Sequence, residues 1–505
     1  MSGRALATET EVKLGAWAGF ELPPLDGTID DVTAMVRAPR TLMAVYYDTP
    51  DLRLARWGVT VRHRTGDTSG WTVKLPEGDD GPALIRRELT FEGSAAAMAE
   101  GAASLITAFT RGTPLVPVAR IRTVRTGVDL VDHEGAVVAE VVDDEVSVLH
   151  GGRVAARFRE VEVELGERPP PGLLDTVVTR LRQAGAGAPD RMPKVVRALG
   201  ARALEPAEVA PGAIGKAPSA ADLVRHAIAS AVERIMRHDP GVRIGDDPED
   251  VHQARVGTRR LRSDLRTFAP LLDEDRLAAL REELRWLAGA LGRVRDADVL
   301  IERLRRQAAS LPEPDTGALA PLFRRLAKER AGARADLLEA MHSPRYVALL
   351  DRLVAAAAEP ACAKMAQEPA KKVVPELVAG PWRTLRKAVK ALPADPPDAD
   401  LHRIRILAKR ARYAAEAAAP TVGKKATAFA AALADLQGVL GDHQDAVVAE
   451  AWLRAAVQSA DDPDSGVSLV AGELIALQRT EAEAGRRQWR KAWDKAAEKK
   501  LRSWL

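Results

Sequence analysis

Several kinds of residue and segment are scarce in this chain, and each scarcity excludes a class of protein. One cysteine, Cys362, stands among 505 residues, so neither an intrachain disulfide framework nor a cysteine-based zinc site can form. We find no run of about 18 uninterrupted apolar residues, and we therefore expect no transmembrane helix and no membrane partner. The N-terminus has no apolar signal-peptide core, so we expect a cytoplasmic location.

The net charge is also small, at +3 from 74 basic and 71 acidic residues. Affinity for a polyanion must then come from local clustering of cations rather than from the overall charge. Aromatic residues make up only 4% of the chain, which leaves few side chains on which bases could stack. Nucleic acid is therefore an unlikely partner.

Short segments of alternating character fill the first 200 residues. In 59–64 and 71–75, apolar and polar side chains alternate with the period of a β-strand, and turns rich in glycine, aspartate or proline separate such segments. Two helical stretches, near 94–110 and 172–185, interrupt the strands. The composition of 1–200 therefore predicts a β-rich domain with a few flanking helices.

Charged side chains share strand faces in this region. Glu9, Glu11 and Lys13 alternate, so they lie on one face of a strand. An ordinary half-buried sheet would show the same alternation, with its charges in solvent. Basic pairs on some strands and acidic pairs on others, with apolar residues behind both, favour a closed barrel with a polar lumen. There, arginine and lysine would bind phosphates and carboxylates would bind Mg²⁺ or Mn²⁺.

The order of these motifs resembles the CYTH family of triphosphate tunnel metalloenzymes over about 5–200. The motifs are Glu9-x-Glu11-x-Lys13, Tyr46-Tyr47-Asp48-Thr49-Pro50, Gly58-x-x-x-Arg62-x-Arg64, Thr72-x-Lys74, Arg86-x-Glu88, Arg120-x-Arg122-x-x-Arg125, Glu140-x-x-Asp143-Asp144 and Glu160-x-Glu162-x-Glu164. The resemblance implies an antiparallel eight-stranded β tunnel that hydrolyses short triphosphates with a divalent metal, Mg²⁺ or Mn²⁺.

The resemblance also implies roles for individual residues. It makes Glu9, Glu11 and Lys13 catalytic. The residues that would bind the triphosphate are Lys13, Arg62, Arg64, Lys74, Arg86, Arg120, Arg122, Arg125 and Lys194. The residues that would hold the metal are Glu9, Glu11, Glu140, Asp144, Glu162 and Glu164.

The character of the sequence changes after residue 200. Residues 201–219 are rich in proline, alanine and glycine, which predicts a linker. From 220 to 505 the apolar residues follow the helical period, so we expect a second, all-α domain and an α+β two-domain protein overall.

An internal repeat runs through the helical region. His252, Arg255, Arg259, Arg260 and Arg262 recur 150 residues later as His402, Arg405, Lys409, Arg410 and Arg412. A second match follows each block, because 291–299 resembles 440–448. Two matches in the same order predict a duplicated helical bundle with pseudo-two-fold symmetry.

In each repeat the basic residues gather on one helical face. Like charges three and four residues apart destabilise an isolated helix, so an anion or an acidic surface is expected against this face. Arginine suits phosphate because its planar guanidinium donates two parallel hydrogen bonds. Two alternatives are a solvated face of extended arginines and a set of internal ion pairs, in particular Lys409 with Glu416.

The two His-x-x-Arg helices and the Leu-Gly-x-x-x-Asp-Ala-x-Val-type segments resemble the CHAD domain over about 220–500. This resemblance implies a helical bundle with a basic cleft that binds inorganic polyphosphate. The residues that would face the polyphosphate are His252, Arg255, Arg259, Arg260, Arg262, His402, Arg405, Lys409, Arg410 and Arg412.

Together the two resemblances predict metal-dependent hydrolysis of inorganic or organic triphosphate in the tunnel, with polyphosphate bound by the helical domain. The alternative is a polyphosphate-binding protein without catalysis, in which the same residues hold the anion and no turnover follows. Nucleic-acid binding through the arginine helices is a third hypothesis, which the low net charge disfavours.

Overall fold

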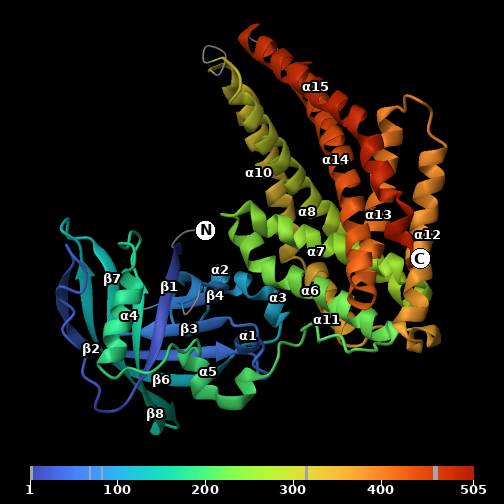
Figure 1. Ribbon diagram of the computed structural model, residues 1–505. Helices are drawn as coiled ribbons and strands as arrows, with labels where there is room; N and C mark the ends of the chain where they lie inside the picture. The colour runs from blue at the N-terminus through green and yellow to red at the C-terminus, as the bar shows by residue number, and fades with distance from the viewer. Residues whose placement is uncertain (1–3, 67–69, 81–82, 313–316, 459–464) are drawn as a thin grey trace. The chain divides into compact units, whose positions relative to one another are not determined.

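The computed structural model describes residues 4–66, 70–80, 83–312, 317–458 and 465–505 (Figure 1). The chain divides into two compact units, Met1–Glu208 and Val209–Leu505. The first unit is a β-barrel with short helices and the second is all-α, which confirms the predicted α+β two-domain fold.

Within the described residues of the first unit, eight antiparallel strands close into a barrel in the order β1-β5-β4-β3-β2-β6-β7-β8. The strands are β1 (Arg4–Ala16), β2 (Thr33–Asp48), β3 (Thr60–Thr65), β4 (Gly70–Asp80), β5 (Ala83–Phe91), β6 (Val116–Val131), β7 (Val137–His150) and β8 (Arg153–Leu165). The helices are α1 (Arg53–Arg56), α2 (Glu100–Leu105), α3 (Thr107–Thr110), α4 (Leu173–Gln183) and α5 (Lys194–Leu199).

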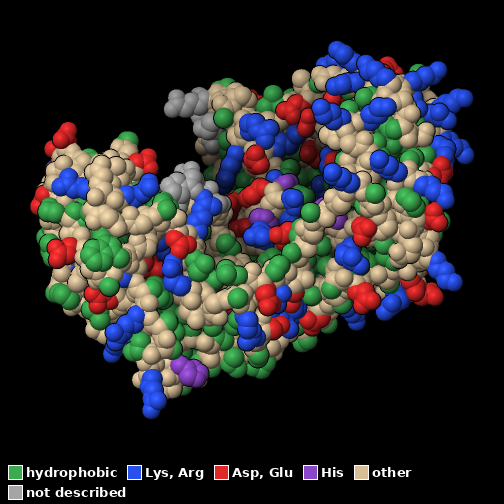
Figure 2. Space-filling view, turned by 60° about the horizontal axis from the view of Figure 1, so that its bottom comes forward, with side chains coloured by type: hydrophobic (Ala, Val, Ile, Leu, Met, Phe, Trp, Pro, Cys, Tyr) green, Lys and Arg blue, Asp and Glu red, His purple; other side chains and the backbone are tan. Residues whose placement is uncertain are grey.

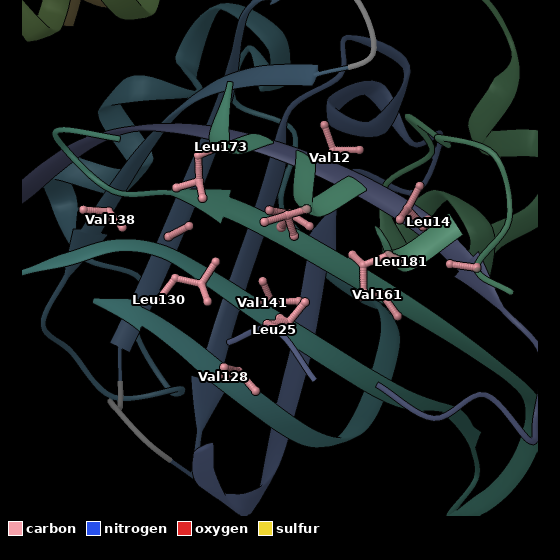
Figure 3. Close-up of a cluster of buried hydrophobic side chains, with 14 of the residues drawn as sticks. Val12, Leu14, Leu25, Val128, Leu130, Val138, Val141, Val161, Leu173 and Leu181 are labelled. Carbon is pink, nitrogen blue, oxygen red and sulfur yellow. The ribbon is translucent and has the colours of Figure 1, made fainter. Parts of the chain in front are cut away.

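The main apolar core of this unit lies outside the barrel, between strands and α4 (Figure 3). Val12, Val141 and Val161 of the strands pack with Leu173 and Leu181 of α4, and all five are almost fully buried. Since side chains alternate across a strand, the apolar outer face leaves every second residue to point into the lumen. The strand period therefore directs the charged residues into the barrel.

The boundary between the units falls after Glu208, inside the predicted linker. The residues before it are structured, because a 3₁₀ turn covers Gly200–Leu204 and the Arg111 guanidinium donates to the Glu208 carboxylate at 2.6 and 2.9 Å. Beyond the boundary, Ser219 caps the first helix of the second unit. Only the middle of the predicted linker thus separates the two units.

The second unit consists of helices in a duplicated arrangement. Its helices are α6 (Ala220–Ile244), α7 (Pro248–Thr267), α8 (Glu274–Ala308), α10 (Ala320–His342), α11 (Pro344–Ala358), α12 (Ala370–Lys390), α13 (Asp398–Val422), α14 (Lys424–Gln458) and α15 (Ser465–Ala496). Helices α6, α7 and α8 begin 150 residues before α12, α13 and α14, respectively. The predicted duplication is therefore present in the helix boundaries. In Figure 1, α8 with α10 and α14 with α15 form two long hairpins.

A search of the described helices for a segment long and apolar enough to cross a bilayer finds none.

Close packing between α6 and α7 depends on Gly257. A β-carbon at this position would lie 2.9 Å from Ile235 Cγ1 and 3.0 Å from the carbonyl oxygen of Ala231. We expect Gly257→Ala to lower the free energy of unfolding by about 1–3 kcal/mol, because an inserted methyl group must push the helices apart. Urea denaturation followed by circular dichroism at 222 nm measures this change.

Gly438→Ala in α14 is the matched control for that substitution. An added β-carbon there meets nothing within 4 Å, so the free energy of unfolding should stay the same or rise by about 0.5–1 kcal/mol. Equal stabilisation by both substitutions would contradict the close approach at Gly257.

Candidate active site and basic cleft

A cavity of about 340 Å³ lies in the lumen of the barrel. Cationic and acidic side chains from the strands and from α5 line it. The cations are Lys13, Arg37, Arg40, Arg62, Arg64, Lys74, Arg86, Arg125 and Lys194, and the carboxylates are Glu9, Glu11, Glu88, Glu140, Glu162 and Glu164. Cations outnumber carboxylates, so the cavity carries excess positive charge for an anionic ligand.

Strand register explains why residues distant in sequence meet in this lumen. Lys13 of β1 stands opposite Glu162 of β8, and Glu11 stands opposite Glu164. Glu9 stands opposite Arg86 of β5 in the same way. Direct cross-strand partners point to the same face of a sheet, so these side chains enter the lumen together.

One group of ions surrounds Lys74. Its Nζ lies 2.8 Å from Glu9 Oε1 and 2.7 Å from Glu88 Oε2. Burial alone would lower the pKa of Lys74, but attraction to Glu9 and Glu88 outweighs burial and raises the pKa. Lys74 therefore stays charged in the lumen.

A second group of ions surrounds Lys194, the first residue of α5. Its Nζ lies 2.8 Å from Asp144, 3.0 Å from Glu160 and 2.8 Å from Glu162. Although burial opposes it, these three carboxylates raise the pKa of Lys194 well above its usual value. Arg125 also binds Asp144 with two hydrogen bonds of 2.8 and 2.7 Å.

Asp144 is fully buried and does not line the cavity. Two cations already neutralise its carboxylate. In this arrangement Asp144 holds Arg125 and Lys194 in place. It does not present oxygen to a metal in the cavity, which was its predicted role. Glu140, another predicted metal ligand, lines the cavity and accepts hydrogen bonds from Arg37 and Arg40 at 2.7 and 3.3 Å.

Three carboxylates, Glu9, Glu11 and Glu164, lie near one another at one side of the cavity. Burial, and then repulsion from the nearby carboxylates of Glu9 and Glu11, raise the pKa of Glu164 to about 8. In addition, Glu11 Oε1 is buried and accepts no hydrogen bond from the described residues. Clustered carboxylate oxygens are the donors that a hard divalent cation prefers, so this donor set fits such a metal.

The side chains are not yet arranged around a metal position. Among the described residues, no group of three or more His, Cys, Asp or Glu side chains has the geometry to hold one. Lysine and arginine contacts occupy several of the carboxylates, as Lys13 does with Glu11 at 3.2 Å and with Glu162 at 3.0 Å. A metal would therefore have to compete with these ion pairs.

Arg120 and Arg122 lie outside the barrel, so their predicted place in the tunnel was wrong. Both are exposed, and neither lines the cavity. Arg122 and Arg125 are an odd number of residues apart on β6, so an unbroken strand presents them on opposite faces. Arg125 faces inward, beside Asp144, and Arg122 therefore faces outward.

Sequence reasoning missed several residues of the tunnel. Arg37 and Arg40 are three apart and yet both line the cavity, because the register of β2 shifts between them in a bulge. No period-two argument could have found this pair. Glu88 and Tyr46 also line the cavity. Both stand in the quoted motifs, and Glu88 is two residues from Arg86, which was predicted.

The helical unit contains its own cleft, of about 420 Å³. Six of the ten predicted anion-binding residues meet there, from two helices that occupy equivalent positions in the two repeats. They are His252, Arg255 and Arg259 of α7 and His402, Arg405 and Lys409 of α13. On the face shown in Figure 2, lysine and arginine are dense over the helical unit, with acidic side chains among them.

Positive charge in the cleft exceeds what its carboxylates neutralise. Arg255 Nη2 lies 2.9 Å from Asp296 Oδ1. Lys409, in contrast, lies among other cations. Burial and then the neighbouring Arg259 and Arg405 lower the pKa of Lys409 to about 6. At neutral pH Lys409 is therefore mostly uncharged until an anion arrives.

The remaining four predicted cleft residues do not line this cleft. Arg260 and Arg412 pair with Glu416, so the predicted pair of Lys409 with Glu416 was wrong. Burial lowers the pKa of Arg262, and the nearby guanidinium of Arg285 in α8 lowers it further. Arg410 lines a different pocket. Cleft residues that the sequence did not predict include Arg295, Arg303 and Gln444. Arg295 and Gln444 lie inside the second repeated segment.

The first unit is a barrel whose lumen is lined by cations and carboxylates, and the second is a duplicated helical bundle with a basic cleft. These features define a triphosphate tunnel protein with a fused helical domain. Family models match both parts, the CYTH domain at residues 7–194 and the CHAD domain at residues 226–454. The chain is 35% identical over 457 residues to the uncharacterized protein MT2285 of Mycobacterium tuberculosis (strain CDC 1551 / Oshkosh), covering 84% of this chain and 85% of that protein. The chain belongs to the family of CYTH–CHAD proteins.

Solved structures resemble parts of the chain. PptA from Streptomyces chartreusis is 27% identical with a TM-score of 0.47, covering 55% of this chain and 99% of that chain. The CHAD domain from the plant Ricinus communis is 30% identical with a TM-score of 0.45, covering 55% of this chain and 95% of that chain. CYTH domains include triphosphatases and cyclases that use divalent metals, so membership supports a triphosphate-related role.

Proposed function

We propose that the tunnel hydrolyses inorganic triphosphate, or a related organic triphosphate, with Mg²⁺ or Mn²⁺. The observation that carries this proposal is the convergence of nine cations and a cluster of carboxylates on one cavity of about 340 Å³. Such a cavity matches a linear triphosphate, whose negative charges are spread along a short chain. Fixed cations stabilise the charge that develops on a transferred phosphoryl group, and this stabilisation is a main source of catalysis in phosphoryl transfer.

The roles follow from the two groups of ions. Arg62, Lys74 and Arg86 grip one part of the phosphate chain, and Arg125 and Lys194 grip the other. Water attacks the terminal phosphorus, the bond from phosphorus to the bridging oxygen breaks, and orthophosphate and diphosphate leave. A divalent cation, when bound, would neutralise negative charge on the phosphate chain.

Glu9, Glu11 and Glu164 are the residues that would hold the cation. Their mutual repulsion, expressed in the raised pKa of Glu164, is relieved by a positive charge between them. Glu140 and Glu162 line the same cavity and can orient water.

Phosphate release by the purified full-length protein tests the activity. The screen uses tripolyphosphate, longer polyphosphate, nucleoside triphosphates and thiamine triphosphate, each with Mg²⁺, with Mn²⁺ and with a chelator. We expect metal-dependent release from at least one short triphosphate. Binding without release from any of them would refute the hydrolase and leave the non-catalytic polyphosphate-binding protein.

For the helical unit we propose that the cleft binds inorganic polyphosphate. The supporting observation is that His252, Arg255 and Arg259 of one repeat face His402 and Arg405 of the other across one cleft. Nucleic acid is the weaker hypothesis. Competition between polyphosphate and RNA at several salt concentrations distinguishes the two.

Polyphosphate binding to the cleft should take up a proton at Lys409. The pKa of this lysine in the free protein is about 6, and a bound anion raises it, so affinity should increase as the pH falls toward 6. We expect Lys409→Gln to bind polyphosphate as the parent does at pH 8 and about tenfold more weakly at pH 5.5, where the parent lysine is charged.

Isothermal titration calorimetry at both pH values measures this difference. The histidines of the cleft and the carboxylates of Asp296 and Asp445 are present in both proteins, so only the difference between parent and variant reports Lys409. An equal loss of affinity at the two pH values would show that the lysine is charged throughout and would contradict the prediction.

A further inference from the structure

A second pocket of the helical unit lies between α7, α12 and α13 and has a volume of about 800 Å³. It shares no lining residue with the basic cleft. Leu377 and Pro381 of α12 and Leu407 of α13 form apolar walls, and Arg266 and Arg410 stand at the pocket from α7 and α13. A volume of this size is typical of pockets for small organic molecules.

The duplication supplies an internal comparison for Arg410. Its counterpart 150 residues earlier, Arg260, binds two carboxylates, Asp264 at 2.9 Å and Glu416. The corresponding neighbours of Arg410 are Ala414, in place of Asp264, and Arg266, in place of Glu416. Arg260 of the first repeat is thus paired with two carboxylates. The equivalent Arg410 of the second repeat has neither carboxylate and has an arginine at one of the two positions instead.

The same comparison explains why there is space beside Arg410. The ring of Tyr413 lies 5.5 Å from the Arg260 guanidinium, whereas the counterpart of Tyr413 is Ser263, which lines the pocket. A second difference concerns helix spacing. The residue equivalent to Leu407 in the first repeat is Gly257, which has no side chain and lets α6 approach α7 closely. The pocket therefore exists where the second repeat departs from the packing of the first.

The other charges at the pocket are already paired. Glu368 accepts from Lys372 at 2.9 Å, and Glu376 pairs with Arg383. Arg266 and Arg410 are both exposed, and within the described part of the chain neither guanidinium forms an ion pair or a hydrogen bond. Burial lowers the pKa of Arg266, and the adjacent Arg410 lowers it further, as expected for two cations held close together without an anion.

We propose that this pocket binds an organic anion with an apolar body, its phosphate or carboxylate head between Arg266 and Arg410 and its body against Leu377, Pro381 and Leu407. Paired guanidiniums suit such a head because each offers a bidentate fork of donors. The apolar walls disfavour inorganic polyphosphate, which would leave them without a partner. This site is independent of the tunnel and of the cleft.

Isothermal titration calorimetry of the full-length protein with decyl phosphate and with decanoate tests the proposal and reports which head is preferred. We expect one equivalent to bind at the pocket. Arg410→Ala should weaken that binding by roughly 10- to 100-fold, because a charge-assisted contact to the head is lost. Inorganic phosphate and decyl maltoside, which lack the body or the charge, should bind at least about tenfold more weakly.

Two further variants separate binding from folding. Arg266→Glu installs the carboxylate that the second repeat has at the equivalent position, Glu416, so it should abolish binding of decyl phosphate while raising the melting temperature. Gly380→Leu adds a side chain in the pocket where a β-carbon meets nothing within 4 Å, and it should also block binding. Gly289→Leu, at an exposed glycine of α8 with equally open surroundings, should not.

Unchanged affinity for decyl phosphate in Arg410→Ala and in Arg266→Glu would overturn the proposal. Equal binding of decyl phosphate and inorganic phosphate would overturn it as well, since the apolar walls would then contribute nothing. Loss of binding in Gly289→Leu together with Gly380→Leu would assign the effect to helix stability rather than to the pocket.

Discussion

Arg62→Ala is expected to lower kcat/KM for metal-dependent hydrolysis of tripolyphosphate by ~10²–10³, the usual cost of losing one preorganised donor to a developing charge. Arg62 points into the cavity, and its guanidinium approaches Glu88 at 4.0 Å. Burial opposes its charge, but Tyr46 and Glu88 raise the pKa of Arg62 above its usual range. The guanidinium is thus held charged, in place, before the substrate arrives.

Arg122→Ala is the matched control, because Arg122 is an exposed arginine on the outer face of the same barrel. It should retain activity within about twofold, as a surface substitution away from the site. Arg62→Lys should recover part of the lost rate, since it keeps the charge and loses the planar fork. Steady-state phosphate release measures all three variants, and circular dichroism verifies their fold. Equal losses from Arg62→Ala and Arg122→Ala would refute the cavity as the reaction site.

The barrel could be predicted from sequence because its motifs are local and strictly ordered. Glu9, Glu11 and Lys13 alternate on one strand, and all three line the cavity as expected. The limit of this reasoning is strand regularity. Strand β6 is regular between Arg122 and Arg125, so these two side chains point to opposite faces. In β2 a bulge brings Arg37 and Arg40 to the same face. A bulge depends on the neighbouring strand, so one strand read alone cannot reveal it.

The helical half shows a different limit. The repeat correctly predicted the duplication and the meeting of Arg255 and Arg405, because both lie at equivalent positions of paired helices. A helical wheel also grouped Arg262 with the cleft residues, since a wheel records angle and ignores position along the axis. Arg262 stands ten residues beyond His252, which is about 15 Å along a helix. The cleft ends before that point.

The charge balance of individual cations could not be predicted either. Arg260 and Arg410 occupy equivalent places in the sequence, yet the first has two carboxylate partners and the second lines an open pocket. The difference is set by residues on neighbouring helix turns and on the opposite repeat. The sequence suggested Lys409 as the partner of Glu416, whereas the arginines Arg260 and Arg412 bind it.

Simultaneous replacement of Arg255 and Arg405 by alanine is expected to weaken polyphosphate binding by ~10²–10⁴, because each removes a charge-assisted contact in the cleft. The two guanidiniums occupy equivalent positions, and each lies close to a glycine of the next helix. Arg255 Nη2 is 3.9 Å from where a β-carbon would stand at Gly292, and Arg405 Nε is 3.6 Å from the same point at Gly441. The absence of side chains there leaves room for the guanidiniums beside the helix backbone.

Calorimetric titration with polyphosphate at several salt concentrations measures the effect. The slope of log affinity against log salt should become shallower by about one for each cation removed, which separates loss of phosphate contacts from general damage. Arg403→Ala is the control, since Arg403 is exposed on the same helix and does not line the cleft. If that control weakens binding as much as the double substitution does, the anion binds the general basic surface of α13 instead of the cleft.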